Sequence, residues 1–298
     1  MTRPCKVGVQ LPEVERFVPW PEYLDLARRA EEVGYDSVWV GDHLIYDLPD
    51  GSTRGPYEAW TTLAAVAAVT QRVELGPLVA STGFHAPAML AKHAATVDAI
   101  SQGRLILGLG AGWNRREFDA FGFRYDRRVS RFAEALAIIA PLLREGRTTF
   151  HGDFYDVADC VLDPSPVREA GPPIMLGSNS PRMLQIGLPA VDCWNVWWSI
   201  YGNSVEGFAE AKEQVDAVTP NGRSVEATAA VLVTLGTGQG RVMGETYDAR
   251  VTTVTPDDLG DHVRGLAAAG ATHLQLVLDP ITAESIDTTG EALRDLDR

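Results

Sequence analysis

A unit of helix, glycine and short buried strand occurs at both ends of the chain, and it constrains the fold more than any other feature. Near the beginning, an amphipathic helix ends at Gly34 and leads into the apolar run SVWV (37–40). Near the end, a helix that starts at TPDD (255–258) ends at Gly270 and leads into HLQLVL (273–278). This repeat predicts helices that alternate with parallel strands.

The alternation continues between the two ends of the chain. The pattern predicts strands at 7–11, 37–40, 73–80, 104–109, 173–177, 191–196, 227–235 and 273–278. It predicts helices at 23–33, 57–70, 86–101, 127–144, 180–188, 204–218, 255–269 and 281–296. The strands are mostly continuous apolar runs, as is typical of parallel strands covered by helices.

Strands and helices that alternate over 298 residues predict an α/β protein with a single (β/α)8 TIM barrel domain spanning residues 1–298. An irregular insertion that includes a small hairpin is expected around residues 145–172. A doubly wound open sheet is the structural alternative.

Charge and composition exclude several classes of function. The net charge of −14 argues against nucleic acid and anionic membrane surfaces as partners. The three dispersed cysteines, Cys5, Cys160 and Cys193, form no disulfide framework, and we expect a cytoplasmic protein.

The first residues lack the apolar core of a signal peptide, and no apolar run is long enough to span a membrane. HxH and HExxH patterns are absent, so no metal site is expected.

Asp42 and His43 directly follow the second predicted strand. In a TIM barrel, catalytic groups lie at the carboxyl ends of the strands. A histidine held in one tautomer by a neighbouring carboxylate can transfer protons near neutral pH. A surface-loop histidine beside an N-capping aspartate is the alternative.

The glycines of GLGAGW (108–113) follow the fourth predicted strand, and they do not fit a dinucleotide fingerprint. The third glycine of GxGxxG would come one residue after Gly112, and the next helix is expected only near Arg127. One interpretation is that the glycines let the backbone lie against a flat ring, with Trp113 beside it. A simple tight turn is the alternative.

Three further clusters carry a functional interpretation and a structural one. Gly177, Ser178 and Asn179 precede a helix and could bind a phosphate, or they could be an ordinary N-cap. Trp194, Trp197 and Trp198 flank Asn195 and could line a pocket, fill the core or form a dimer interface. A group of arginines could bind an anionic ligand, or it could be a solvated helix face paired with Glu117, Asp119 and Asp126; its members are Arg115, Arg116, Arg124, Arg127, Arg128 and Arg131.

Nearly the whole chain resembles a known family. It resembles the bacterial luciferase-like flavin and deazaflavin oxidoreductases, and is most similar to their coenzyme F420-dependent branch. The stretches that carry the resemblance are YDSVWVGDHL (35–44), LGPLVASTGFHAPAMLAKHAATVDAISQGRLILGLGAGWNRREFDAFG (75–122), PIMLGSNSPRMLQIG (173–187) and TPDDLGDHVRGLAAAGATHLQLVL (255–278).

The resemblance implies a homodimeric barrel that holds a deazaflavin, coenzyme F420, at the strand ends, with FMN as the alternative cofactor. It implies that Asp42 and His43 lie beside the ring and that His43 transfers a proton. It also implies a non-proline cis peptide near Leu78-Val79, within one residue. The other residues expected to bind the cofactor are Ala111, Gly112, Trp113, Gly177, Ser178, Asn179 and Asn195.

The chain departs from the family pattern at two positions. Trp113 stands where sugar-phosphate dehydrogenases of this branch carry a catalytic glutamate, which puts that substrate in doubt. His85 stands where many relatives carry arginine before the proline of the third loop. We expect Trp113, His85, Trp197 and Trp198 to shape a pocket for a small-molecule substrate.

These features predict an F420-dependent oxidoreductase that moves hydride between C5 of the deazaflavin and a small organic substrate. His43, oriented by Asp42, is expected to transfer the accompanying proton. One alternative is a monooxygenase that uses reduced FMN and O2. The other is a flavin-binding barrel without catalysis.

Overall fold

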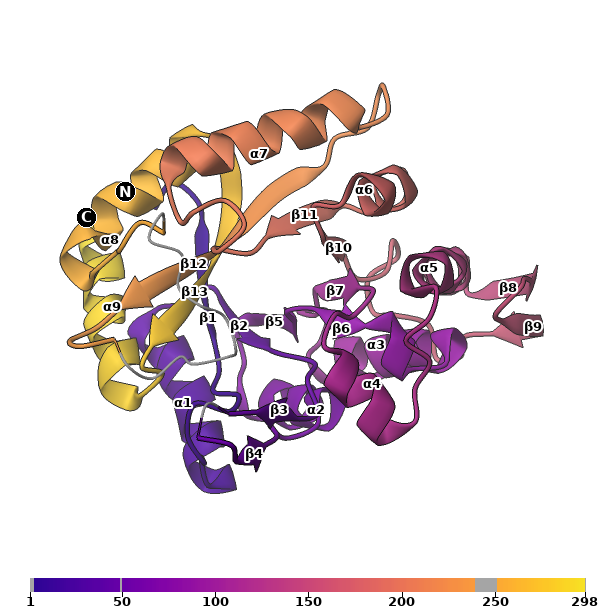
Figure 1. The fold of residues 1–298 in the computed structure, drawn as a ribbon, viewed down its shortest axis with the longest axis horizontal. Helices are drawn as coiled ribbons and strands as arrows, with labels where there is room; N and C mark the ends of the chain where they lie inside the picture. The colour runs from indigo at the N-terminus through magenta and orange to yellow at the C-terminus, as the bar shows by residue number, and fades with distance from the viewer. Residues whose placement is uncertain (1–2, 49, 239–250, 298) are drawn as a thin grey trace.

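Parallel strands form a single sheet that curves round the centre of the molecule (Figure 1). The computed structural model describes residues 3–48, 50–238 and 251–297. Within these residues the sheet has the strand order β5-β2-β1-β13-β12-β11-β10-β7-β6. The strands are β1 (Lys6–Gln10), β2 (Ser37–Val40), β5 (Glu74–Pro77), β6 (Ala80–Ser81), β7 (Leu107–Gly110), β10 (Ile174–Gly177), β11 (Cys193–Val196), β12 (Glu226–Thr234) and β13 (Ala271–Asp279).

The two ends of this sheet are halves of one interrupted strand. β5 pairs with β2, and β6, which follows β5 after two residues, pairs with β7. Leu75 of β5 also forms a bridge to Leu105, just before β7. The sheet therefore closes on itself, and the described chain contains the eight barrel positions that the sequence predicts. The TIM barrel is confirmed, and the open-sheet alternative is wrong.

Helices surround the barrel (Figure 1). They are α1 (Trp20–Val33), α2 (Ala59–Val69), α3 (Pro87–Ile100), α5 (Arg128–Glu145), α6 (Pro181–Gly187), α7 (Val205–Val218), α8 (Pro256–Ala268) and α9 (Ala283–Leu296). Each corresponds to a predicted helix. The sequence analysis missed a short helix, α4 (Arg115–Phe121), and a one-turn 3-10 helix at Thr82–Phe84.

Two small hairpins project from this framework. The expected hairpin in the insertion is confirmed as β8 (Arg147–His151) paired with β9 (Asp156–Val161), at the right of Figure 1. A second hairpin, β3 (Tyr46–Asp47) with β4 (Thr53–Arg54), lies in the loop after β2 and was not expected.

The helix ends follow the signals in the sequence. Gly34 ends α1 in the left-handed conformation, with φ of 106°. Thr255 and Asp258 form a capping box at the start of α8, in which each residue bonds the backbone N–H of the other. These caps define where the repeated helix–glycine–strand unit begins and ends.

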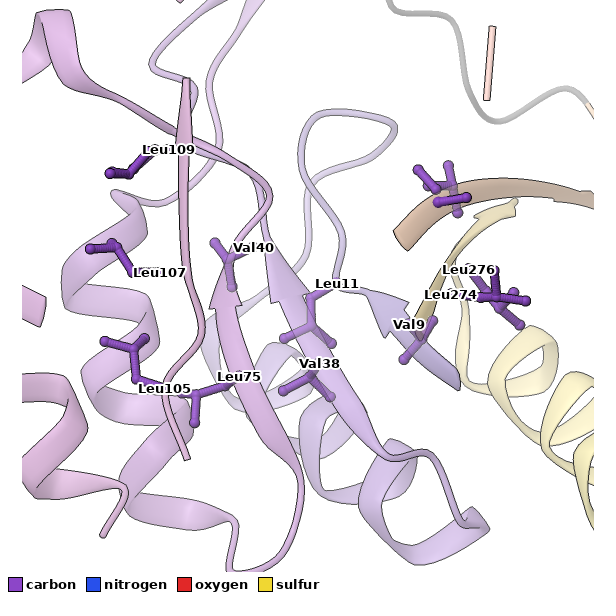
Figure 2. Close-up of a cluster of buried hydrophobic side chains, with 14 of the residues drawn as sticks. Val9, Leu11, Val38, Val40, Leu75, Leu105, Leu107, Leu109, Leu274 and Leu276 are labelled. Atoms are coloured by element: carbon purple, nitrogen blue, oxygen red, sulfur yellow. The ribbon is translucent and has the colours of Figure 1, made fainter. Parts of the chain in front are cut away.

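Alternate residues of each strand face opposite sides of the barrel wall. The outward side chains, such as Val9, Val38 and Leu274, pack against the helices and form the main core (Figure 2). Inside the barrel, Trp39, Leu78, Ile106, Met175 and Cys193 form a smaller apolar cluster. This inner cluster lies below the cavity described next.

Candidate active site

A cavity of about 550 Å³ opens at the carboxyl ends of the barrel strands. Most of the residues expected to bind a cofactor or substrate line it. They are Asp42, His43, Leu78, Val79, Ala111, Gly112, Trp113, Gly177, Ser178, Asn179, Asn195, Trp197 and Trp198. Residues that the sequence analysis did not assign to a site also line it, among them Gln10, Glu13, Tyr46, Ser81 and Glu117.

His43 is held by Glu117, not by Asp42. Nδ1 of His43 lies 3.1 Å from both carboxylate oxygens of Glu117. The Glu117 side chain is 1% exposed, and it also accepts the backbone N–H of Leu44 at 2.6 Å. The predicted pairing with Asp42 is therefore wrong. The missed helix α4, capped by Asn114, carries Glu117 to this position.

Asp42 faces a different histidine. Its Oδ2 accepts the backbone N–H of Ser81 at 2.8 Å and lies 3.1 Å from Nε2 of His85. His85 packs behind Asp42 against the rings of Trp60 and His93 and is not among the described residues that line the cavity. The expectation that His85 shapes the substrate pocket is wrong. The contact of His85 with Oδ2 instead helps to hold Asp42 in place.

The surroundings of His43 favour its protonated form. Burial lowers the pKa of His43, but the hydrogen bond to Glu117 and the charges of Glu13, Glu117 and Asp42 outweigh burial and raise the pKa above its usual value. With Nδ1 bonded to Glu117, Nε2 is the ring nitrogen left for proton exchange with a ligand. This arrangement suits a histidine that exchanges a proton.

Replacing Glu117 with glutamine is expected to lower the pKa of His43, because the amide removes the charge that stabilises the imidazolium. The pKa of His43 is higher in the folded protein than in the unfolded chain, so protonation of His43 stabilises the fold. This contribution to stability is complete below pH ~6.5, and it is lost as the pH rises through the folded-state pKa. NMR titration of the His43 ring in both proteins measures the shift. An unchanged or higher pKa in Glu117→Gln would remove Glu117 from this role.

The peptide bond between Leu78 and Val79 is cis, as the resemblance implied. It lies in the two-residue break between β5 and β6, and both side chains line the cavity. This break therefore contributes two side chains to the cavity lining.

The glycines of the fourth and fifth barrel strands make room for this break. A Cβ on Gly108 would lie 2.2 Å from the carbonyl oxygen of Pro77, and a Cβ on Gly110 or Gly177 would lie 2.9 or 2.7 Å from a methyl of Val79. Gly108 and Gly110 are therefore needed to leave space for the chain around Val79. The interpretation that these glycines let the backbone lie against a flat ring missed this role. Gly110 still lines the cavity.

Gly112 is needed for a different reason. Its φ is +75°, and a Cβ there would lie 2.5 Å from Oγ of Ser81 and 2.7 Å from the ring of Phe118. The loop 111–113 is thus pressed against the start of α4 and borders the cavity. Trp113 at its end is 55% exposed and meets the His43 ring edge to face at 5.7 Å.

The loop after β10 contains the N-cap of the structural interpretation, and it also borders the cavity. Ser180 is an N-cap whose hydroxyl accepts the N–H of Met183, and Ser178 accepts the N–H of Ser180. The same loop lines the cavity, and Oδ1 of Asn179 is buried there with no hydrogen-bond partner among the described residues. That atom is available for a ligand.

The arginines divide into two groups. Arg115 pairs with Asp119 and Arg131 with Asp126, as expected for a solvated helix face. Arg128 differs from these, because it lines the cavity, donates to the carbonyl of Gly112 at 3.0 Å and stacks on the ring of Tyr125. One arginine of the cluster therefore faces the cavity.

The three tryptophans at 194, 197 and 198 lie in two different environments. Trp194 points outward into the main core beside Phe208, and its indole N–H donates to the carbonyl of Ser178. Trp197 and Trp198 line the cavity. Asn195 points into the barrel, where its amide donates to Thr228 and Gln275 at 2.8 and 2.7 Å.

Within the described residues, no group of three or more histidine, cysteine or acidic side chains is arranged to hold a metal ion. No helix in that part of the chain is long and apolar enough to cross a membrane.

The fold is a TIM barrel, and its cavity opens at the strand ends. The family model for luciferase-like monooxygenases matches residues 7–241. The chain therefore belongs to the luciferase-like monooxygenase family.

Relatives in sequence include F420-dependent enzymes. The chain is 34% identical over 180 residues to an F420-dependent glucose-6-phosphate dehydrogenase of Amycolatopsis mediterranei, covering 59% of this chain and 52% of that protein. It is 30% identical over 204 residues to a 5,10-methylenetetrahydromethanopterin reductase of Archaeoglobus fulgidus, covering 67% of this chain and 56% of that protein. The chain thus spans about half the length of the curated relatives it matches.

Solved structures share the fold at low identity. An F420-dependent secondary alcohol dehydrogenase in complex with an F420-acetone adduct superposes with a TM-score of 0.78 and 18% identity, over 100% of both chains. A long-chain alkane monooxygenase superposes with a TM-score of 0.79 and 15% identity, over 99% of this chain and 92% of the other. The fold is thus shared by enzymes of both chemistries.

Proposed function

We propose that this protein is an F420-dependent oxidoreductase that exchanges hydride with a small organic substrate. One observation carries the proposal: His43, paired with the buried Glu117, lines the same cavity as Leu78 and Val79. The F420-dependent relatives support the choice of cofactor.

The residues of the cavity fit such a cofactor. Oγ of Ser81 and Oδ1 of Asn179 are buried, unpartnered polar atoms in the lining. They suit the polar edge of a deazaflavin ring and the hydroxyls of its ribityl chain. The phosphate would lie near Gly177 and Ser178, with Arg128 as the nearby cation.

A bound deazaflavin supplies the position, C5, that accepts or donates hydride. His43 then holds or takes the accompanying proton at Nε2, while Glu117 fixes the ring through Nδ1 and stabilises its charge. Asp42, backed by His85, orders the segment at Ser81 beneath the site. Trp113 covers the side of His43 and limits access of water.

The second candidate is a monooxygenase that uses reduced FMN and O2, which the alkane monooxygenase fold favours. Oxidation of reduced F420 by a panel of small ketones and aldehydes, followed without oxygen, tests the main proposal. We expect oxidation that requires protein and carbonyl compound but not O2. Oxygen uptake with reduced FMN, together with no anaerobic oxidation of reduced F420, would favour the second candidate instead.

We also propose that the chain acts as one barrel domain, as a homodimer in the cytoplasm. Met89 and Ile100 expose apolar surface on α3, which suits a contact with a second copy. Light scattering of the purified protein gives the mass, and a monomer would contradict the dimer.

A further inference from the structure

Two large apolar side chains at the mouth of the cavity remain in contact with solvent. Trp113 is 55% exposed and Ile200 is 57% exposed, and both line the cavity. They lie in different loops, because Trp113 follows β7 and Ile200 follows β11. A ligand that covers an exposed apolar side chain removes it from water, which is favourable. Exposed apolar surface at the rim of a cavity therefore points to an apolar ligand.

Backbone contacts hold the two loops in place, so the shape of the loops does not depend on these side chains. The hydroxyl of Tyr125 donates to the backbone carbonyl of Trp113 at 3.3 Å. The backbone N–H of Ile200 donates to the carbonyl of Trp197 at 2.9 Å. Isolated exposed apolar residues are common on protein surfaces, whereas these two border one cavity together with aromatic rings.

Trp113 brings aromatic surface to the proposed proton-transfer group. Its ring meets the ring of His43 edge to face, with 5.7 Å between the ring centres. The ring centre of Tyr46 lies 4.8 Å from that of His43 and 6.3 Å from that of Trp113. All three residues line the cavity. A substrate that exchanges a proton with His43 therefore has aromatic rings beside its reacting carbon.

The loop after β11 extends this apolar surface. Trp197 and Trp198 line the cavity with their ring centres 6.1 Å apart, and Ile200 follows them. Val129 of α5 and Met183 of α6 also line it. A compound with many hydroxyls would lose hydrogen bonds to water against such side chains, and each polar group buried without a partner costs free energy.

We propose that the substrate is an apolar compound with a single hydroxyl or carbonyl group at the reacting carbon. Its carbon body lies against Trp113 and Ile200, and its oxygen lies at Nε2 of His43. Polyhydroxylated compounds bind poorly, because the apolar walls do not replace the water that their hydroxyls lose. The inference rests on the proposed function, because it names the substrate class of the same site.

The redox step on such a substrate balances. Oxidation of the hydroxyl form breaks one C–H bond and one O–H bond. The hydride carries both electrons to C5 of oxidised F420, and the hydroxyl proton passes to Nε2 of His43. The C–O bond becomes a carbonyl as the cofactor is reduced. Reduction of the carbonyl form is the same step in reverse.

Two six-membered carbon rings test the proposal: cyclohexanol, which has one hydroxyl, and myo-inositol, which has a hydroxyl on every carbon. Their dissociation constants are measured by ligand-observed NMR on protein saturated with reduced F420, with which an alcohol cannot react, and on protein without cofactor. The variants are Trp113→Ala and Ile200→Ser. The matched controls are Phe17→Ala and Val161→Ser, at exposed positions outside the described lining of the cavity.

We expect wild-type protein to bind cyclohexanol at least about tenfold more tightly than myo-inositol, because binding of cyclohexanol buries apolar area. Each variant should lower this preference about threefold or more, and both controls should match the wild type. Equal or tighter binding of myo-inositol to wild-type protein would overturn the proposal, and so would an undiminished preference in Trp113→Ala or Ile200→Ser. If a variant does not fold, the order of the two probes on wild-type protein still decides.

This inference and the proposed function can fail separately. Absence of F420 binding, with cyclohexanol preferred by the cofactor-free protein, would contradict the proposed function and leave the apolar preference standing. Normal binding of F420 with preference for myo-inositol would do the reverse.

Discussion

Replacing His43 with alanine is expected to lower kcat about 10²–10⁴-fold, the usual contribution of a positioned general acid or base. The affinity for the cofactor should change little, because no cofactor-binding atom is removed near Ser81 or Asn179. Steady-state kinetics and cofactor titration of the same preparation measure the two effects.

A matched control is His151→Ala, on the exposed hairpin strand β8, which should retain full turnover. Equal kcat in His43→Ala and wild-type protein would remove His43 from the mechanism. A large loss of cofactor affinity with unchanged kcat would assign His43 to binding instead.

Replacing Gly108 with alanine is expected to destabilise the barrel by at least about 1–3 kcal/mol, the range for overpacked interiors. The added Cβ would lie 2.2 Å from the carbonyl oxygen of Pro77, a backbone atom, so relief requires movement of the chain beside Leu78 and Val79. Cofactor affinity should fall together with stability, because Leu78 and Val79 line the cavity. Urea unfolding and cofactor titration measure both.

The control for Gly108→Ala is Gly260→Ala in α8. A Cβ on Gly260 makes only ordinary contacts, the nearest at 3.7 Å, and alanine favours a helix interior by about 0.5–1 kcal/mol. Gly260→Ala should therefore be neutral or stabilising. A Gly108→Ala protein with wild-type urea midpoint and cofactor affinity would show that the glycine is not needed for the break at Val79.

Local sequence patterns predicted the barrel well, because helix caps and apolar runs act within a few residues. The end of α1 at Gly34 and the start of α8 at Thr255 depend on local backbone geometry, and the residue types at these positions indicate that geometry. The short helix α4 escaped prediction, because its seven residues are too few for a clear apolar period.

The site was predicted less completely, because its key contacts join distant parts of the chain. Glu117 lies 74 residues from His43, so nothing local to Asp42-His43 indicated the true partner. The capping Asn114 followed by Glu117 in NRRE was the one available signal for a helix that starts there. Likewise, the glycines of GLGAGW indicated a close approach but not that the approaching group is Val79.

The central claim is that the cavity is a deazaflavin site, and titration of the purified protein, freed of bound cofactor, with F420 and with FMN tests it most directly. Each cofactor is added oxidised and reduced, and binding is followed by absorbance and fluorescence. The account predicts saturable, tight binding of F420 and much weaker binding of FMN. Tight binding of FMN with negligible binding of F420 would contradict it.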